Sequence, residues 1–490
     1  MNWTKFGQNL LRTYPKPSLS TASYSKVSFF KHYSSKLKTV NVRETLLELG
    51  ENFNKTGQAQ PFKGTLLVGV QHILATTIDM FSVLKTQGLE SAILTGKSYS
   101  THSKSAKELK KMYVGLIPEP EQMGYGRFDD SMREATYQVW NKALQKIKKR
   151  KYELIITLDD GADLLLSTPS KLFNDIRSKP ETIIGIEQTR GGSNRSVFRG
   201  LPFPIINVAG SFIKNVIEYP KVARVVSQKI SVLIKNEIEP QLLRKPVIGI
   251  IGKGSMGKAL IEKLSAEGYT IFVYDKEEYQ QDASIKAIRY PDSGLLIMSV
   301  DIIIGCTGQD ITLSPGALNA FLYSTQNKWL ISTSSKDIEF NKLLEAIRNQ
   351  IEQPKQMLNP LKDIHYKNVV GAHLTVVRGG FPVNFDNSPH SVPPEDIWPT
   401  RAALLLACTM SANLHQTKHS ILQTASILKL DAQGQLAILR KYQEYNPDND
   451  FLKSFSTLST EEALDYINEH SEGEKVSMDM ENNASLKLKM

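Results

Sequence analysis

Three glycines spaced within six residues are the feature of this chain that points most directly to a chemistry. They stand in the segment Gly252-Lys253-Gly254-Ser255-Met256-Gly257. In a strand–turn–helix unit, Gly252 permits a tight turn, Gly254 lets a pyrophosphate approach the backbone, and Gly257 lets the helix pack closely on the strand. The phosphates would then lie at the positive end of the helix, beside Ser255 and Met256. The spacing therefore predicts a dinucleotide-binding turn.

The residues around this motif supply the other parts of such a site. We expect a strand over Pro246–Ile251, a helix over Lys258–Glu267 and a second strand over Thr270–Tyr274, which ends at Asp275. A carboxylate there accepts hydrogen bonds from the ribose hydroxyls and repels a 2′-phosphate, so the pattern favours NAD over NADP. A later strand over Asp301–Ile304 leads into small residues suited to lie against the dinucleotide, namely Cys306, Thr307 and Gly308.

Strands and helices of similar length alternate along the rest of the chain. The expected strands are Thr65–Val70, Ser91–Thr95, Glu153–Leu158, Thr182–Ile186 and Lys328–Thr333. The expected helices are Val42–Phe53, Ala75–Gln87, Asp129–Lys149, Pro169–Ile176 and Ser211–Asn236, with a helical pattern again from Asp396 to Tyr445. Alternation of this kind predicts the α/β class, with parallel sheets covered on both faces.

The same pattern suggests a division of the chain into domains. We expect two doubly wound parallel-sheet domains, with the Rossmann NAD-binding domain inserted into a split substrate domain. Residues 44–241 would form the first part of the substrate domain, residues 245–375 the Rossmann domain, and residues 376–470 the return to the substrate domain with C-terminal helices. Residues 471–490 are polar and poor in aromatics, so we expect them to be disordered.

Composition narrows the classes of function. The net charge of +10 comes largely from residues 1–43, which hold eight basic residues and no acid; removing them leaves 52 basic against 50 acidic residues. That basic segment is expected to be a loose tail, with an organelle-targeting segment as the alternative to a cytoplasmic location. The two cysteines, Cys306 and Cys408, allow no disulfide framework. We expect neither nucleic acid nor a membrane as partner.

Five further motifs occur in an order that resembles the S-adenosylhomocysteine hydrolase (adenosylhomocysteinase) family across roughly residues 60–450. They are Gly69-Val70-Gln71-His72, Leu158-Asp159-Asp160-Gly161-Ala162-Asp163, Gly185-Ile186-Glu187-Gln188-Thr189, Ile206-Asn207-Val208 with Ser211 and Lys214, and Arg378-Gly379-Gly380-Phe381-Pro382-Val383-Asn384. Each is short, and their shared order carries the resemblance.

The resemblance implies roles for particular residues. Those enzymes use tightly held NAD to oxidise the ribose 3′-hydroxyl of the substrate, eliminate a thiol, add water and return the hydride. Lys214 matches the lysine that assists removal of the hydroxyl proton, and burial would lower its pKa for that task. Asp160 matches a carboxylate in acid–base chemistry, and His72 a histidine beside the leaving group. Asn384 matches the asparagine that holds the nicotinamide carboxamide. A nucleoside-type substrate and a homo-oligomer are therefore expected.

Departures from the family pattern fall mainly on the substrate site. Gln188 replaces a glutamate, the run of threonines has become Thr189-Arg190-Gly191, and Glu218 stands where the family has aspartate. Ser334-Ser335 replaces a glycine–histidine pair, and His390 at best represents the closing histidine.

Three functions stay open. The first is an enzyme with this chemistry acting on a thioether nucleoside, or on a relative of one that carries an anionic group. The second is a catalytically inactive NAD-binding relative with a sensing or regulatory role. The third is a 2-hydroxyacid dehydrogenase, which shares the nucleotide fold but has its Arg, Glu and His in another motif context.

Overall fold

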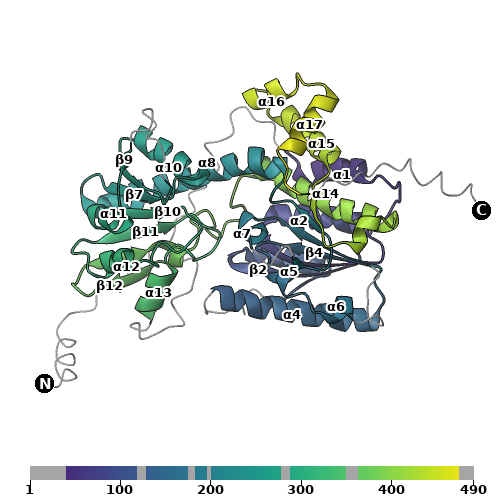
Figure 1. Ribbon diagram of the computed structural model, residues 1–490, viewed down its shortest axis with the longest axis horizontal. Coiled ribbons are helices and arrows are strands. Elements are labelled where there is room, and N and C mark those ends of the chain that lie inside the picture. Colours follow the sequence, from purple (N-terminus) through teal and green to yellow (C-terminus); the bar gives the residue numbers. More distant parts are fainter. Residues whose placement is uncertain are drawn as a thin grey trace, which may run out of the picture. The chain divides into compact units, whose positions relative to one another are not determined.

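The computed structural model describes residues 40–118, 128–174, 182–195, 200–277, 287–348 and 362–473. The sequence expectations for residues 1–39 and 474–490, which cover most of the basic segment and the polar C-terminal segment, lie outside this range. In the described part, no helix is long and apolar enough to cross a bilayer. Two α/β domains make up the described chain, each built on a seven-stranded sheet (Figure 1).

The first sheet is parallel throughout, and its strands are buried on both faces, which explains their long apolar runs. In spatial order the strands are β14 (Ile427–Lys429), β6 (Ile205–Asn207), β5 (Thr182–Glu187), β4 (Leu154–Asp159), β1 (Thr65–Ile73), β2 (Ser91–Thr101) and β3 (Val114–Leu116). The order reverses between β1 and β4, so polar residues at the carboxyl ends of these strands and their neighbours meet at a switch point, where ligands bind in such folds.

Helices cover both faces of this sheet (Figure 1). One core lies under α1 (Val42–Phe53), α2 (Ala75–Thr86), α14 (Pro394–Gln416) and α15 (Ala432–Tyr445). The other lies under α4 (Phe128–Lys149), whose Trp140 is buried. The shorter helices are α3 (Ser103–Lys111), α5 (Asp163–Leu166), α6 (Lys171–Asn174), α7 (Arg190–Ser193), η9 (Ser420–Gln423), α16 (Asp450–Phe455) and α17 (Thr460–Glu469).

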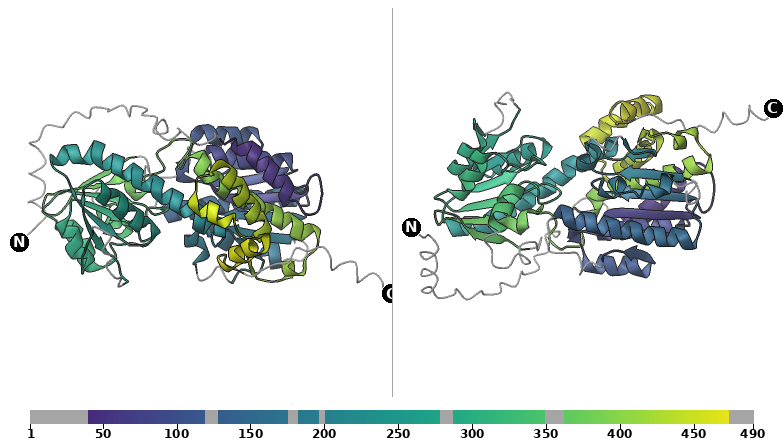
Figure 2. Two further views of the ribbon diagram at one scale, coloured as in Figure 1. Left: turned by 90° about the horizontal axis from the view of Figure 1, so that it is seen from above. Right: turned by 60° about the horizontal axis from the view of Figure 1, so that its bottom comes forward.

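The second sheet is the expected Rossmann-type sheet, parallel except at one edge. Its order is β12 (Ile364–Lys367), β13 (His373–Val376), β11 (Lys328–Ser332), β10 (Ile302–Gly305), β7 (Val247–Ile251), β8 (Thr270–Tyr274) and β9 (Ile288–Arg289), with β12 antiparallel to β13. One face carries α10 (Ser255–Ala266), and the other carries α11 (Ser293–Ser299), α12 (Pro315–Leu322) and α13 (Asn341–Arg348) (Figure 2). The short helix η8 (Val377–Gly380) follows β13.

The first sheet is completed only after the second domain has been traversed. Strand β14 pairs with β6, although all of the second sheet lies between them in sequence. The predicted insertion of a Rossmann domain into a split α/β domain is thus confirmed. Residues 396–445, however, are not helical throughout, because Ile427–Lys429 forms this edge strand. A three-residue strand is too short to reveal a period of two in the sequence.

A long helical stretch, Ile213–Leu242, joins the two domains. It consists of η5 (Ile213–Glu218), α8 (Tyr219–Leu233), η6 (Ile234–Ile238) and α9 (Glu239–Leu242), and η5 and η6 are π-helical. Each π-helical segment ends just before a proline, Pro220 or Pro240, which has no N–H to donate to the carbonyl four residues earlier. A widened turn supplies other donors there. Helix α8 packs against α10, and its Val226 and Ile230 belong to the core of the second domain.

Candidate active site

The glycine turn has the close contacts that its sequence requires. Gly252 has φ +102°, and a Cβ there would lie 2.9 Å from the backbone of Cys306. A Cβ on Gly257 would lie 2.0 Å from the carbonyl oxygen of Gly252, so only glycine lets α10 approach the turn. A Cβ on Gly254 would meet nothing within 4 Å, which leaves this backbone open to an approaching pyrophosphate.

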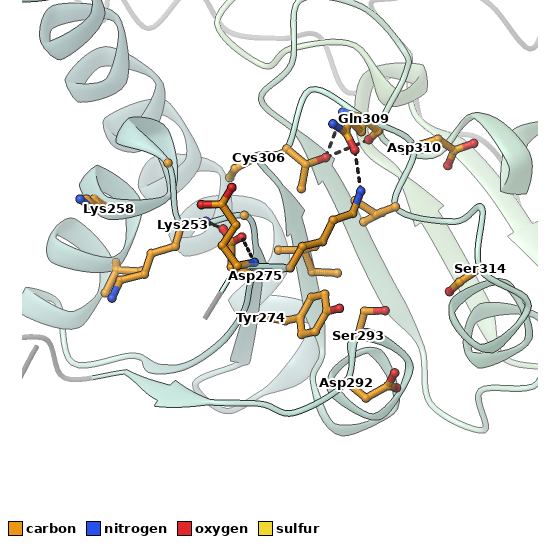
Figure 3. Close-up of a pocket in the computed structure, with 18 of the residues that line it drawn as sticks. Lys253, Lys258, Tyr274, Asp275, Asp292, Ser293, Cys306, Gln309, Asp310 and Ser314 are labelled. Atoms are coloured by element: carbon orange, nitrogen blue, oxygen red, sulfur yellow. Dashed lines mark hydrogen bonds between the residues drawn. The ribbon is translucent and has the colours of Figure 1, made fainter. Parts of the chain in front are cut away.

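A cavity of about 1400 Å³ lies over this turn (Figure 3). Gly252, Gly254, Asp275, Cys306 and Thr307 of the predicted cofactor site all line it. The Asp275 carboxylate accepts hydrogen bonds from the backbone N–H groups of Lys253 and Glu277. It is thereby held at the end of β8, where a ribose would lie in a Rossmann domain, so the residues present fit a bound dinucleotide.

The other predicted cofactor residues have different surroundings. Ser255 begins α10, and Met256 packs against the core beneath it. Gly308 lines a second, smaller cavity. The Asn384 side chain is buried, and its backbone carbonyl accepts a hydrogen bond of 3.1 Å from Lys229 Nζ. The predicted contact of Asn384 with a nicotinamide carboxamide stays a prediction.

The loop after β10 is held by a carboxylate that the sequence analysis missed. The buried Glu339 accepts hydrogen bonds from the backbone N–H groups of Thr307 (2.8 Å) and Gly308 (2.7 Å). It also accepts from the Thr307 and Ser334 hydroxyls. Because the loop is already fixed, it loses little conformational entropy when a dinucleotide binds against it.

In the first domain, three polar side chains converge on Asp160 at the carboxyl edge of the sheet. The Lys97 ammonium and the Gln188 amide contact its two carboxylate oxygens, and His72 Nε2 lies 3.3 Å from Oδ2. Asp160 and Gln188 directly follow β4 and β5, and His72 and Lys97 lie in the carboxyl-terminal halves of β1 and β2. These four strands are adjacent in the sheet, so the topology places the side chains together. The sequence analysis named Asp160, His72 and Gln188 but missed Lys97, because it ended the second strand at Thr95.

Charge compensation fixes the protonation of this cluster. Burial acts against the Asp160 anion, but Lys97, His72 and Gln188 outweigh it and hold the pKa of Asp160 below its usual range. Burial lowers the pKa of His72 to about 3, so the ring is neutral at pH 7. Its Nδ1 lies 2.5 Å from the Ser100 hydroxyl. With Nδ1 accepting from Ser100, Nε2 carries the proton and donates to Asp160.

A second charged pair, Lys214 with Glu218, occupies the π-helical segment η5. Both side chains are buried, and the Lys214 ammonium donates to Glu218. Burial favours the neutral amine, but the Glu218 carboxylate outweighs it, and the pKa of Lys214 is raised. The expectation of a lowered pKa is therefore wrong, because it took account of burial alone and not of a carboxylate one helical turn away. The charges of Lys214 and Asp160 influence each other, so the two belong to one charged neighbourhood.

Beneath Asp160 lie two further carboxyl groups, Asp159 and Glu187, opposite each other on β4 and β5. Burial raises the pKa of Asp159 to about 7 and that of Glu187 well above its usual value. Glu187 Oε1 accepts from the backbone N–H of Gly161 (3.2 Å) and from the backbone N–H and hydroxyl of Thr189. These carboxyl groups anchor the two loops that carry Asp160 and Gln188.

A second cavity, of about 690 Å³, opens at the Asp160 cluster. Its lining includes Lys97, Asp160 and Thr189 from the first domain and Gly308 and Ser335 from the second. His390 lies instead on the return segment, where its backbone carbonyl accepts from the Ser388 hydroxyl at 2.6 Å; burial lowers the pKa of its ring. The structure thus groups Asp160, His72 and Gln188 with Lys214 and Glu218 nearby. In the described part of the chain, no cluster of His, Cys, Asp and Glu could hold a metal ion.

Comparisons with known proteins identify the second domain. Residues 247–347 match the family described as the NAD binding domain of 6-phosphogluconate dehydrogenase. This is an NAD-binding domain. Two uncharacterized proteins of Mycobacterium tuberculosis are each 28% identical over 340 residues, which cover 68% of this chain. The chain spans 61% of the length of these relatives.

Solved structures show only a distant likeness. A 2-hydroxyacid dehydrogenase from Ketogulonicigenium vulgare is 12% identical, with a TM-score of 0.34, and the match covers 73% of this chain and 94% of that one. The D-lactate dehydrogenase of Aquifex aeolicus, complexed with NAD and lactic acid, is 15% identical, with a TM-score of 0.28 over 41% of this chain and 62% of that one. These low scores do not bear on the activity of the chain.

Proposed function

We propose that the protein is an NAD-dependent enzyme that oxidises a secondary hydroxyl of a small polar substrate, with chemistry related to that of the adenosylhomocysteinases it resembles. One observation carries the proposal. The NAD-binding domain shares a chain with a buried acid–base cluster, Asp160 with Lys97 and His72, at the carboxyl edge of a second α/β sheet. Burying charged groups is costly, and clusters of this kind are common at functional sites.

The chain's residues would divide the work as follows. NAD, when bound, supplies a hydride acceptor. The Asp160 carboxylate accepts a hydrogen bond from a substrate hydroxyl and fixes its orientation. Lys214, in its neutral form, takes up the proton of the substrate hydroxyl during oxidation, and in the reverse direction its ammonium, which Glu218 favours, donates that proton to the carbonyl oxygen. The neutral His72 donates to Asp160 and keeps that carboxylate in place.

The chemistry after oxidation is where this chain departs from the family. Gln188 cannot act as a base, and its amide is already engaged with Asp160 and with Gln71. We therefore propose hydride transfer as the reaction, on a substrate that differs from S-adenosylhomocysteine. Elimination and hydration, as in a hydrolase, are the further steps that the family resemblance supports.

The test is transient reduction of bound NAD, followed by absorbance of the reduced nicotinamide in NAD-loaded protein. The panel comprises adenosine, S-adenosylhomocysteine, 5′-methylthioadenosine, D-lactate and D-glycerate. At least one should give the signal, and Lys214→Ala should abolish it while NAD stays bound. Lys235→Ala is the matched control, because Lys235 lies on the same helical stretch and pairs with Glu267. No reduction with any compound would favour the non-catalytic NAD-binding relative.

A further inference from the structure

A buried arginine beside the Asp160 cluster, Arg401, forms no ion pair with any carboxylate of the residues that the structure describes. Arg401 lies on α14 and is 4% exposed. Its Nε donates to the Thr76 hydroxyl at 3.2 Å, and its Nη1 lies 3.5 Å from the Gln71 side-chain oxygen. Both acceptors are neutral. Among the residues that the structure describes, no carboxylate forms an ion pair with this guanidinium.

The other buried cations of this neighbourhood do have partners. Lys97 pairs with Asp160, and Lys214 pairs with Glu218. Burying a guanidinium without a counter-ion costs several kcal/mol. Consistent with that cost, burial lowers the pKa of Arg401, although the more distant charges of Glu218, Asp160 and Asp79 act in the opposite direction. A bound anion would supply the missing partner and offset this cost.

Arg401 and the residue before it, Thr400, contact the two parts of the candidate active site. On one side, the Gln71 side-chain oxygen accepts a hydrogen bond from the Arg401 guanidinium. The Gln71 amide donates to Gln188 at 3.1 Å, and Gln188 in turn donates to Asp160. On the other side, the preceding residue, Thr400, donates to Glu218, the partner of Lys214. This part of α14 therefore lies between the Asp160 cluster, which Arg401 reaches through Gln71, and the Lys214–Glu218 pair, which Thr400 contacts.

We propose that Arg401 binds an anionic group of the substrate, a carboxylate or a phosphate, and so selects the substrate of this site. The inference rests on the proposed function for the identity of the site. It deepens that function by assigning a substrate with two features: a hydroxyl near Asp160 and Lys214, and an oxyanion at Arg401. A guanidinium binds either oxyanion through two parallel hydrogen bonds, which makes it selective for planar or tetrahedral anions.

Anion binding can be measured without turnover. The melting temperature of NAD-loaded protein is recorded in sodium phosphate, sodium malonate and sodium chloride at equal ionic strength. Phosphate or malonate should raise it relative to chloride, and Arg401→Gln should remove the rise. Arg401→Lys keeps the charge and should retain part of it. In chloride, Arg401→Gln should melt no lower than the unmodified protein, because the lost charge had no partner.

Calorimetry with a matched pair of ligands adds a second readout. S-adenosylhomocysteine carries a carboxylate that 5′-methylthioadenosine lacks. Arg401→Gln should weaken binding of the first by about 10- to 100-fold and leave the second unchanged. Arg244→Gln is the control, since Arg244 is already paired with Asp301 and should leave both affinities intact.

The outcomes separate this proposal from the proposed function. An anion-dependent rise in melting temperature that requires Arg401, without any reduction of NAD, would support the anion site and contradict the enzymatic assignment. Equal responses of the unmodified protein and Arg401→Gln would overturn the role of Arg401, whatever the redox assay shows. A response confined to phosphate or to malonate would identify which oxyanion the substrate carries.

Discussion

Whether Lys214 can take up a proton depends mainly on one neighbouring charge, that of Glu218. The Glu218 carboxylate raises the pKa of Lys214, so the amine is charged at neutral pH and acts most readily as a proton donor to a carbonyl. Oxidation of a hydroxyl needs the neutral amine. The rate of NAD reduction should therefore rise as the pH approaches the pKa of Lys214. The rate of the reverse reaction should fall over the same pH range, because it uses the protonated amine.

Glu218→Gln tests this dependence. Removing the negative charge should lower the pKa of Lys214, because it removes the largest effect that opposes burial. The pH profile of NAD reduction should shift to lower pH by about 1 unit or more. The measurement is the initial rate of nicotinamide reduction from pH 6 to pH 10. Glu108→Gln, which disrupts the exposed Lys111–Glu108 pair, is the control and should leave the profile in place. An unshifted profile in Glu218→Gln would exclude Lys214 as the titrating group.

The preference for NAD over NADP also depends on a single carboxylate, that of Asp275. Its carboxylate is positioned at the end of β8 by the backbone of Lys253 and would repel a 2′-phosphate. Calorimetry should show NAD binding more tightly than NADP, and Asp275→Ala should reduce that preference by about tenfold. Tighter binding of NADP by the unmodified protein would contradict this assignment.

The sequence could predict some of these residues but not their partners. Asp160, His72 and Gln188 each sit in a recognisable motif at a strand end, so their meeting at one sheet edge follows from the topology. Lys97 and Arg401 sit in no motif. Their significance comes from contacts with residues 63 and 330 positions away in sequence, which only the folded chain supplies. The raised pKa of Lys214 differs from these cases, because Glu218 lies four residues further along a predicted helix and the i,i+4 pair could have been predicted from the sequence.

At the scale of elements, two glycines of the turn have different tasks. Gly257 permits close packing of α10, and Gly254 leaves the backbone open to a ligand. Gly257→Ala would force a Cβ against the Gly252 carbonyl and should destabilise the protein by about 1–3 kcal/mol. Gly254→Ala meets open space and should leave the melting temperature nearly unchanged while weakening NAD binding. Thermal melts of the two variants, each with and without NAD, distinguish these effects. Equal loss of stability in both would show that the turn is not open at Gly254.

Most elements could be predicted from apolar periodicity, and the exceptions have physical causes. Residues 211–236 show a helical pattern, but the π-helical segments depend on where Pro220 and Pro240 remove donors, and this does not change the periodicity. Strand β14 is short and lies between helices, so tertiary pairing with β6 decides its state. Strand β2 continues six residues past its predicted end at Thr95, and that extension carries Lys97 and Ser100.

At the scale of the molecule, the core of the NAD-binding domain extends beyond the glycine motif and its sheet. Val226, Ile230 and Ile234 of the joining helical stretch and Val377 and Val383 of the return segment belong to it. A fragment of residues 219–384 should therefore fold and bind NAD, whereas a fragment of residues 245–375 should expose this apolar surface and aggregate. Size-exclusion chromatography and NAD calorimetry of the two fragments provide the test. Equal behaviour would show that the joining helix contributes no stability.

The pairing of β14 with β6 also has a consequence for how the chain is made. A ribosome adds about 5–20 residues per second, so some 220 residues of synthesis separate the two strands by roughly 10–45 s. Throughout that interval, β6 has no partner on its outer side and presents an open row of backbone donors and acceptors, the kind of edge that promotes aggregation. The inserted domain can fold meanwhile, since its strands are contiguous in sequence. Nascent chains should therefore need protection by chaperones mainly in their first domain. They should need it until β14, in the last third of the chain, has been translated.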